Sequence, residues 1–160
     1  MKKTSIALLV AVATASMTIS THSVNAAEAK SERQAANAVQ FRQSLLQLVR
    51  SNLGPLGAMA KGQIPYDVNV MSTNAVRLEQ LSLMLPDYFE TDTRAFSVET
   101  ESLPKIWDEM DSFLSKANDL TVAAKALQVA SKSGDESEYR AAIGKVGSTC
   151  KGCHDSYKKD

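Results

Sequence analysis

The chain has 160 residues, 44% of them hydrophobic, a length that suits one domain with its own buried core. Eighteen basic residues balance eighteen acidic ones, so no basic excess is available for gripping nucleic acid. A charged fraction of 22% excludes a disordered polyelectrolyte, and two cysteines are too few for a disulfide-stapled mini-fold.

The first 26 residues have the pattern of a secretory signal peptide. Two lysines precede an apolar run over residues 6–15, and small residues lead up to Ala26. The run is too short to span a bilayer, and it lacks the polar face of an amphipathic helix. We therefore expect cleavage after Ala26, a periplasmic location and no membrane insertion. The remaining chain has a formal charge of −2, and His154 is its only histidine because His22 is removed.

The first half of the mature chain contains two segments with the 3.6-residue hydrophobic period of a helix. The first spans residues 31–52 and is expected to end at Gly54-Pro55. Its predicted buried stripe consists of Ala38, Phe41, Leu45, Leu48 and Val49. The second segment begins after Asp67, which serves as its N-cap, and is expected to stop at Pro86.

Two further helical segments follow a long connection. The third begins at Pro104 and carries apolar residues in steps of four and three, the pattern of antiparallel bundles. The fourth follows a break at Gly134 and starts with a capping box formed by Asp135 and Glu138. No segment has a convincing period of two, so no strand is predicted.

These elements predict an all-α fold, an antiparallel up-down-up-down four-helix bundle over residues 27–160. The four helices are joined by short connections except between the second and the third. The connection over residues 87–102 is long for a small bundle, and loops of that length are usually functional.

The chemistry of the chain is concentrated in Cys150-Lys151-Gly152-Cys153-His154, a C-x-x-C-H sequence of the kind that attaches haem c. Two thiols add across the two vinyl groups of haem, and the adjacent imidazole coordinates the iron. A helix advances by about 100° per residue, which places all three side chains within an arc of roughly 100°. Gly152 has no side chain to obstruct the approach of a flat ring.

Three other fates of the cysteines compete with haem attachment. A disulfide is the usual product of two nearby thiols in an oxidising compartment. A thioredoxin-like redox motif requires a βαβ context, and structural zinc requires four ligands where the mature chain offers three. The export signal favours haem, because bacteria attach haem covalently beyond the cytoplasmic membrane.

The position of the motif in the last helix, together with four amphipathic helices, resembles the cytochrome c′ family of class II c-type cytochromes. The resemblance covers essentially the whole mature chain, and its specific marks are residues 38–44, 61–67, 103–107 and 146–157. It implies one haem c attached covalently through Cys150 and Cys153, with His154 as the iron ligand.

The second axial position distinguishes a gas-binding protein from an electron carrier. A low-spin carrier needs a second strong ligand such as Met or His. None of the mature methionines, Met59, Met71, Met84 and Met110, lies in the central part of the first helix, where low-spin relatives place that ligand. The resemblance instead assigns to Leu46 the role of an apolar cap that does not bond to iron. Leu46 lies one helical turn after Arg42.

The resemblance also implies contacts with the edges and propionates of the haem. These contacts are assigned to Arg42, Gln43, Phe89, Thr100, Glu101 and Lys158. Ordinary alternatives stay open for three residues: Leu46 as a core leucine, Arg42 as a solvent-exposed arginine, and Lys158 as a lysine that suits the helix dipole.

The functional expectation is a five-coordinate, high-spin haem protein that binds NO and CO. Its expected role is nitric oxide sequestration or buffering, with electron-transfer capability. The alternative is an electron shuttle with a sixth ligand that is not evident in the sequence. A peroxidase-like enzyme is disfavoured, because the apolar Leu46 provides no acid–base group.

The expected partners are small diatomic gases, redox proteins and a second copy of the chain. The resemblance implies an antiparallel homodimer through the first two helices. Leu53, Leu56 and Val70 are the candidate exposed apolar residues for that interface.

Overall fold

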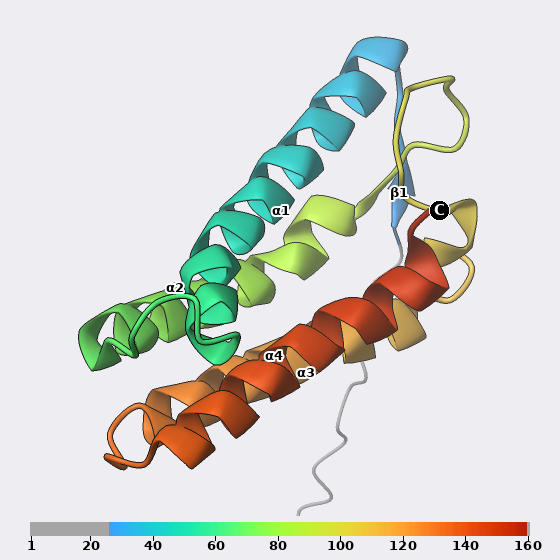
Figure 1. Cartoon of the computed structure of the whole chain (residues 1–160). Coiled ribbons are helices and arrows are strands. Elements are labelled where there is room, and N and C mark those ends of the chain that lie inside the picture. Colours follow the sequence, from blue (N-terminus) through green and yellow to red (C-terminus); the bar gives the residue numbers. More distant parts are fainter. Residues whose placement is uncertain (1–25, 160) are drawn as a thin grey trace, which may run out of the picture.

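The computed structural model describes residues 26–159, so the expected signal peptide lies outside this part of the chain except for Ala26. The four helices, in chain order, are α1 (Glu32–Ala60), α2 (Val68–Phe89), α3 (Met110–Ala130) and α4 (Glu136–Tyr157). The shorter elements are β1 (Ala27–Glu28), β2 (Thr91–Asp92) and a 3₁₀ turn, η1 (Pro104–Ile106). The predicted all-α four-helix bundle is confirmed (Figure 1).

Side-chain caps begin three of the helices. The Asp67 carboxylate accepts hydrogen bonds from the backbone of Asn69 and Val70, as the sequence predicts. Asp135 caps α4 by accepting from the Ser137 N–H. The predicted capping box is incomplete, because the N–H of Asp135 donates to the Ser133 hydroxyl instead of to Glu138.

Two prolines that were expected to end helices lie inside them. α1 continues past Pro55, and α2 continues past Pro86. An interior proline removes one backbone donor and costs about 3 kcal/mol. Burial offsets this cost, because the residues beyond each proline include Leu56 and Phe89, which are 0% and 3% exposed. α1 ends instead before Gly62, whose φ of 69° suits glycine.

The third helix starts later than its sequence indicates. Pro104 opens η1, and α3 begins only at Met110. The Trp107 indole N–H donates to the Phe89 carbonyl at 3.2 Å, which holds the turn against the end of α2. The chain therefore changes direction after Trp107 before it enters α3.

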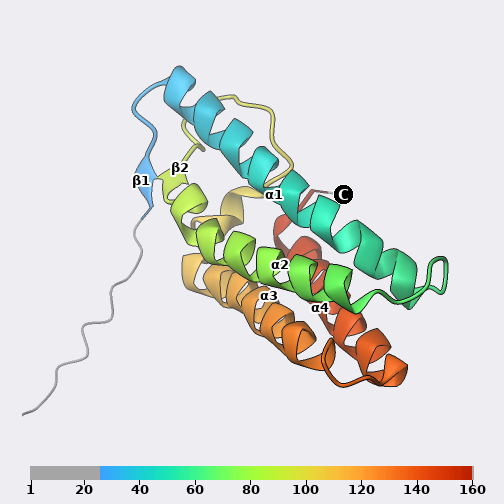
Figure 2. The same cartoon turned by 90° about the vertical axis from the view of Figure 1, so that its left-hand side faces the viewer.

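A short parallel pairing that the sequence did not reveal joins β1 to β2 (Figure 2). The Ala27 N–H donates to the Glu90 carbonyl at 2.7 Å, and the Ala29 N–H donates to the Asp92 carbonyl at 2.8 Å. Strands of two residues are too short to show an alternating pattern. This pairing attaches the segment before α1 to the segment after α2.

The interior consists of two groups of buried side chains. The first core cluster contains Val49, Leu56, Met59, Met71, Ala75, Leu78, Leu120, Ala123, Ala124, Leu127, Tyr139, Ile143 and Val146. The second core cluster contains Leu45, Leu85, Phe89, Ile106, Met110, Phe113, Ala117 and Tyr157. A buried contact of 2.7 Å between the hydroxyls of Ser82 and Thr121 joins α2 to α3.

Several apolar residues lie elsewhere than predicted. Phe41 and Leu48 were assigned to the buried stripe, but they are 57% and 54% exposed. The proposed dimer residues show the opposite error: Leu56 is buried, while Leu53 and Val70 are half-buried and pack on the first core cluster. A stripe drawn from periodicity alone does not define which flank of a helix its neighbours cover.

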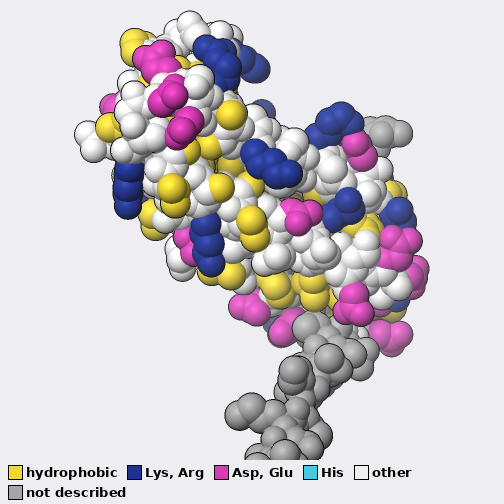
Figure 3. Space-filling model, turned by 90° about the horizontal axis from the view of Figure 1, so that it is seen from below, with side chains coloured by type: hydrophobic (Ala, Val, Ile, Leu, Met, Phe, Trp, Pro, Cys, Tyr) yellow, Lys and Arg dark blue, Asp and Glu magenta, His cyan; other side chains and the backbone are white. Residues whose placement is uncertain are grey.

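The surface carries charges of both signs, interspersed with apolar side chains on the face that Figure 3 shows. This mixture agrees with the equal numbers of acidic and basic residues. Within residues 26–159, no helix is long and apolar enough to cross a membrane.

Candidate haem site

The last turns of α4 present the two cysteines and the histidine of the C-x-x-C-H motif. Cys150 and Cys153 are half-buried, and Cys153 packs against the second core cluster. His154, the next residue, is exposed. Two thiols on successive turns with an imidazole beside them are the donor set that a c-type haem requires.

The thiols do not have the character of a redox pair. Both cysteines are free. Burial raises the pKa of the Cys150 thiol, and burial likewise raises the pKa of Cys153 despite the opposing charge of Lys116. Redox-active C-x-x-C motifs instead have a thiol with a depressed pKa. Among residues 26–159, no group of three or more Cys, His, Asp or Glu side chains is arranged to hold a metal ion.

The C-terminal end of α4 is attached to the chain that precedes η1. The Leu103 N–H donates to the Tyr157 carbonyl at 2.9 Å, and the Lys159 N–H donates to the Glu101 carbonyl at 2.8 Å. An ion pair of 3.0 Å joins Lys158 to the Glu101 carboxylate. Two candidates that are far apart in the sequence, Glu101 and Lys158, are therefore brought together one turn from His154.

Leu46 is 42% exposed on α1, so the alternative of a core leucine is wrong. Its level along the bundle relative to His154 is inferred from one contact between α1 and α4. The Arg140 guanidinium of α4 donates to the Ala60 carbonyl at the end of α1. Leu46 precedes Ala60 by 14 residues, and His154 follows Arg140 by 14 residues. Because the two helices run antiparallel with the same rise per residue, this register places Leu46 opposite His154. Figure 1 shows α1 and α4 diverging toward this end of α4.

Arg42 is buried, with 2% of its surface exposed, so the alternative of a solvent-exposed arginine is wrong. Three of its five N–H donors point at protein acceptors, all of them between Tyr88 and Thr93. Burial lowers the pKa of Arg42 to about 10, with the charge of Asp92 opposing the shift, so the side chain remains cationic at neutral pH. Its assignment to a haem propionate stays a prediction.

The other candidates are distributed around the same end of the bundle. Phe89 is buried in the second core cluster, with its ring centroid 4.6 Å from that of Phe113. Gln43 is exposed on α1. Thr100 is half-buried, and its hydroxyl accepts from the Ser102 N–H at 3.2 Å. Their contacts with haem also stay predictions.

Sequence reasoning missed the group of side chains around Trp107. The guanidinium carbons of Arg42 and Arg94 lie 5.1 and 5.8 Å from its ring centroid. Arg94 lies in the long connection, and Trp107 lies in the third predicted segment but outside its apolar stripe, so no hydrophobic pattern identifies a partner for either residue. The one available signal was the presence of a single tryptophan in the chain.

The bundle and the C-x-x-C-H end of α4 together define a c-type haem protein of the four-helix class. The sequence model of the family described as cytochrome C′ matches residues 37–158, and the chain belongs to this family. It therefore carries covalent haem c, with Cys150 and Cys153 at the attachment motif.

Known relatives cover nearly the whole described chain. The chain is 38% identical over 126 residues to cytochrome c′ from Cereibacter sphaeroides, and the match covers 78% of this chain and 84% of that protein. The structure of cytochrome c′ from Shewanella frigidimarina is similar with a TM-score of 0.71 and 40% identity, covering 79% and 97% of the two chains. A ferrous variant of the Alcaligenes xylosoxidans protein with bound NO gives a TM-score of 0.69 and 36% identity, covering 79% and 96%.

Replacement of Cys150 and Cys153 by alanine is expected to abolish covalent pigment. The measurement is haem staining after denaturing electrophoresis, with Ser148→Ala as a control for substitution in the same helix. Haem that stays with the double variant through denaturation contradicts attachment at this motif.

Proposed function

We propose that the protein is a periplasmic haem protein with five-coordinate, high-spin iron that binds NO and CO. Its role is to sequester or buffer nitric oxide, with electron transfer as a further capability. The observation that supports the proposal is the register of α1 and α4, from which we infer that the apolar Leu46 faces His154.

The residues on the two sides of the site have different tasks. His154 would hold the haem iron from α4, and the bound haem would supply the iron that takes up a diatomic ligand. Leu46 has no hydrogen-bonding group, so it gives no stabilisation to bound O₂. A charged ligand such as cyanide loses its hydration in apolar surroundings, whereas NO and CO are uncharged.

The positions of the methionines support an iron without a protein ligand on its second face. Met59 and Met71 lie in the first core cluster, and Met110 lies in the second, on α3. Met84 is partly exposed on α2. None of the four lies on α1 near Leu46. The NO-bound structures of the Alcaligenes xylosoxidans relative also support gas binding.

Binding rather than catalysis is the activity that these side chains support. Peroxidase-type chemistry requires a group that moves a proton on the open side of the iron, and Leu46 has none. The signal-peptide pattern of residues 1–26 supports export to the periplasm, and redox protein partners there remain part of the proposal.

An absorption spectrum of the purified, reduced protein tests the coordination state. Five-coordinate, high-spin iron is expected to give broad, unresolved visible bands, because Leu46 provides no ligand. Sharp, well-separated bands would show a sixth ligand and would make electron transfer the leading function.

Replacement of Leu46 by alanine is expected to open the second face of the iron and to raise CO affinity. We expect a rise of about tenfold or more in affinity, which corresponds to about 1.4 kcal/mol or more. The measurement is CO titration of the reduced protein. Val129→Ala, at an exposed position near the end of α3, is the control. Equal CO affinity in the Leu46 variant and wild type would remove Leu46 from this role.

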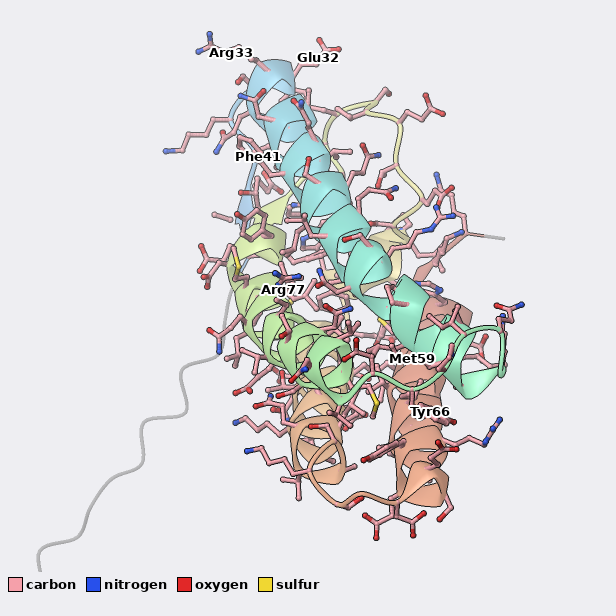
Figure 4. All side chains as sticks on the ribbon, turned by 60° about the vertical axis from the view of Figure 1, so that its left-hand side comes forward. Glu32, Arg33, Phe41, Met59, Tyr66 and Arg77 are labelled. Carbon is pink, nitrogen blue, oxygen red and sulfur yellow. The ribbon has the colours of Figure 1, made fainter. Side chains whose placement is uncertain are left out.

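We further propose that the chain forms a homodimer through the outer face of α1 and α2. Phe41, Leu48 and Met84 are 57%, 54% and 37% exposed on these two helices. The hydrogen bonds from Arg42 to Tyr88 and from Asn74 to Asn52 show that α1 and α2 run antiparallel, which places Met84 between the levels of Phe41 and Leu48. Figure 4 shows Phe41 and Arg77 on the outer side of this helix pair.

Replacement of Phe41 by glutamate is expected to convert the dimer to a monomer, because a charge replaces the most exposed apolar side chain of the proposed interface. Sedimentation velocity measures the change. Leu83→Glu is the control, since Leu83 is 51% exposed and lies one turn after Glu79, which contacts Gln128 and Lys125 of α3. A monomeric wild-type protein, or a Phe41 variant that remains dimeric, would be evidence against this interface.

A further inference from the structure

Buried Arg42 makes an unusual number of contacts with one short stretch of chain. Its Nε donates to the Tyr88 carbonyl at 2.7 Å, and one terminal nitrogen donates to the Thr93 hydroxyl at 3.2 Å. The other terminal nitrogen donates to the Thr91 carbonyl. All three acceptors belong to the segment Tyr88–Arg94, which leads from the end of α2 into the long connection.

Aromatic rings complete the surroundings of this guanidinium. Its central carbon lies 4.9 Å from the ring centroid of Phe89 and 5.1 Å from that of Trp107. The Trp107 indole N–H donates to the Phe89 carbonyl. Two kinds of contact therefore hold the Arg42 side chain: directional hydrogen bonds and stacking on aromatic rings.

A second arginine fixes the far end of the same segment. Arg94 pairs with Asp92 at 2.7 Å and with Asp108 at 2.5 Å, and it also contacts the Trp107 ring. Burial alone would raise the pKa of Asp92, but hydrogen bonds from Arg94 and the charges of both arginines hold it below its ordinary value. Hydrogen bonds from both arginines therefore fix the residues of β2 and the residue after it.

We propose that Arg42 is a positioning residue that clamps the segment Tyr88–Arg94 to α1 and thereby controls access of gas to the face beside Leu46. Arg42 precedes Leu46 by one turn of α1, so its bonds set how that part of α1 lies against the rest of the bundle. The clamped segment also carries Phe89, which packs with Tyr157 and Phe113 beside Cys153. The link to gas access rests on the proposed function, whereas the clamp itself does not.

The geometry requires arginine rather than another cation. A lysine ammonium is a point charge without a planar fork, so it cannot reach three acceptors on different residues and stack on rings at the same time. Arg42→Lys keeps the positive charge and removes the clamp. This separates positioning from a purely electrostatic role of the side chain.

The clamped segment contains a direct reporter of its own release. Glu90 lies between Tyr88 and Thr91, and its carbonyl accepts from the Ala27 N–H at 2.7 Å, so a glutamate-specific protease cleaves after Glu90 when the segment opens. Loss of even one charged hydrogen bond corresponds to about a tenfold larger open population, and we expect cleavage after Glu90 to be about tenfold faster or more in holo Arg42→Lys. We also expect a severalfold faster association of CO with its reduced form.

Two variants control for other effects of the substitution. Arg50→Lys makes the same change at an exposed position of α1, and Ser82→Ala weakens a buried contact between α2 and α3 away from the clamp. Both are expected to keep the wild-type cleavage and CO rates. A faster rate in Ser82→Ala equal to that in Arg42→Lys would overturn the proposal, because general loss of stability would then explain it.

The two readouts separate the clamp from the proposed function. An unchanged cleavage rate in Arg42→Lys overturns the clamp. This holds also where the variant shifts only the reduction potential of the haem, which is the effect expected if Arg42 pairs with a propionate and does not hold the segment. Faster cleavage with unchanged CO association overturns the control of gas access. Failure of the wild-type protein to bind CO refutes the proposed function, while the cleavage comparison still tests the clamp.

Discussion

Covalent attachment of haem through two thiols of one helix, with a histidine next to the second, constrains everything around the haem. The geometry of α4 alone relates the positions of Cys150, Cys153 and His154 to one another. The site is therefore ordered only if the last turns of that helix are ordered. Helix ends fray when nothing holds them. In this chain the end of α4 is held by backbone bonds from Leu103 and Lys159 and by the ion pair between Lys158 and Glu101.

Burial of a permanent charge creates a second constraint. A guanidinium removed from water destabilises the fold unless its donors find acceptors, and a charged hydrogen bond contributes about 1.5–3 kcal/mol. Arg42 meets this requirement with two carbonyls and a hydroxyl from one short segment, and the same segment cannot move without leaving the charge unpaired. Any other position of that segment leaves a buried charge without acceptors, so burial of Arg42 favours a single position of the segment.

Regular structure and the attachment motif were predictable from the sequence because both depend on neighbouring residues. The caps Asp67 and Asp135 and the C-x-x-C-H motif act over three or four positions. Pro55 and Pro86 gave wrong helix ends, since burial of residues beyond them outweighs the missing donor.

Long-range contacts could not be predicted in this way. The contacts of Arg42 span 46 to 51 residues, and no local pattern encodes such distances. Phe41 and Leu48 were misplaced for a related reason: periodicity gives a face, while neighbouring helices decide which part of it is covered.

The long connection between α2 and α3 explains how two diverging helices keep their register. α1 and α4 contact each other near Ala60 and Arg140 but separate toward the end that carries His154. At that end, the residues from Tyr88 to Leu103 contact both helices, α1 through Arg42 and α4 through the bonds that hold its last turn. Side chains of both helices also meet in the second core cluster, where Leu45 of α1 lies with Tyr157 and Cys153 of α4. The relative position of α1 and α4 at this end therefore depends on the connection together with that cluster.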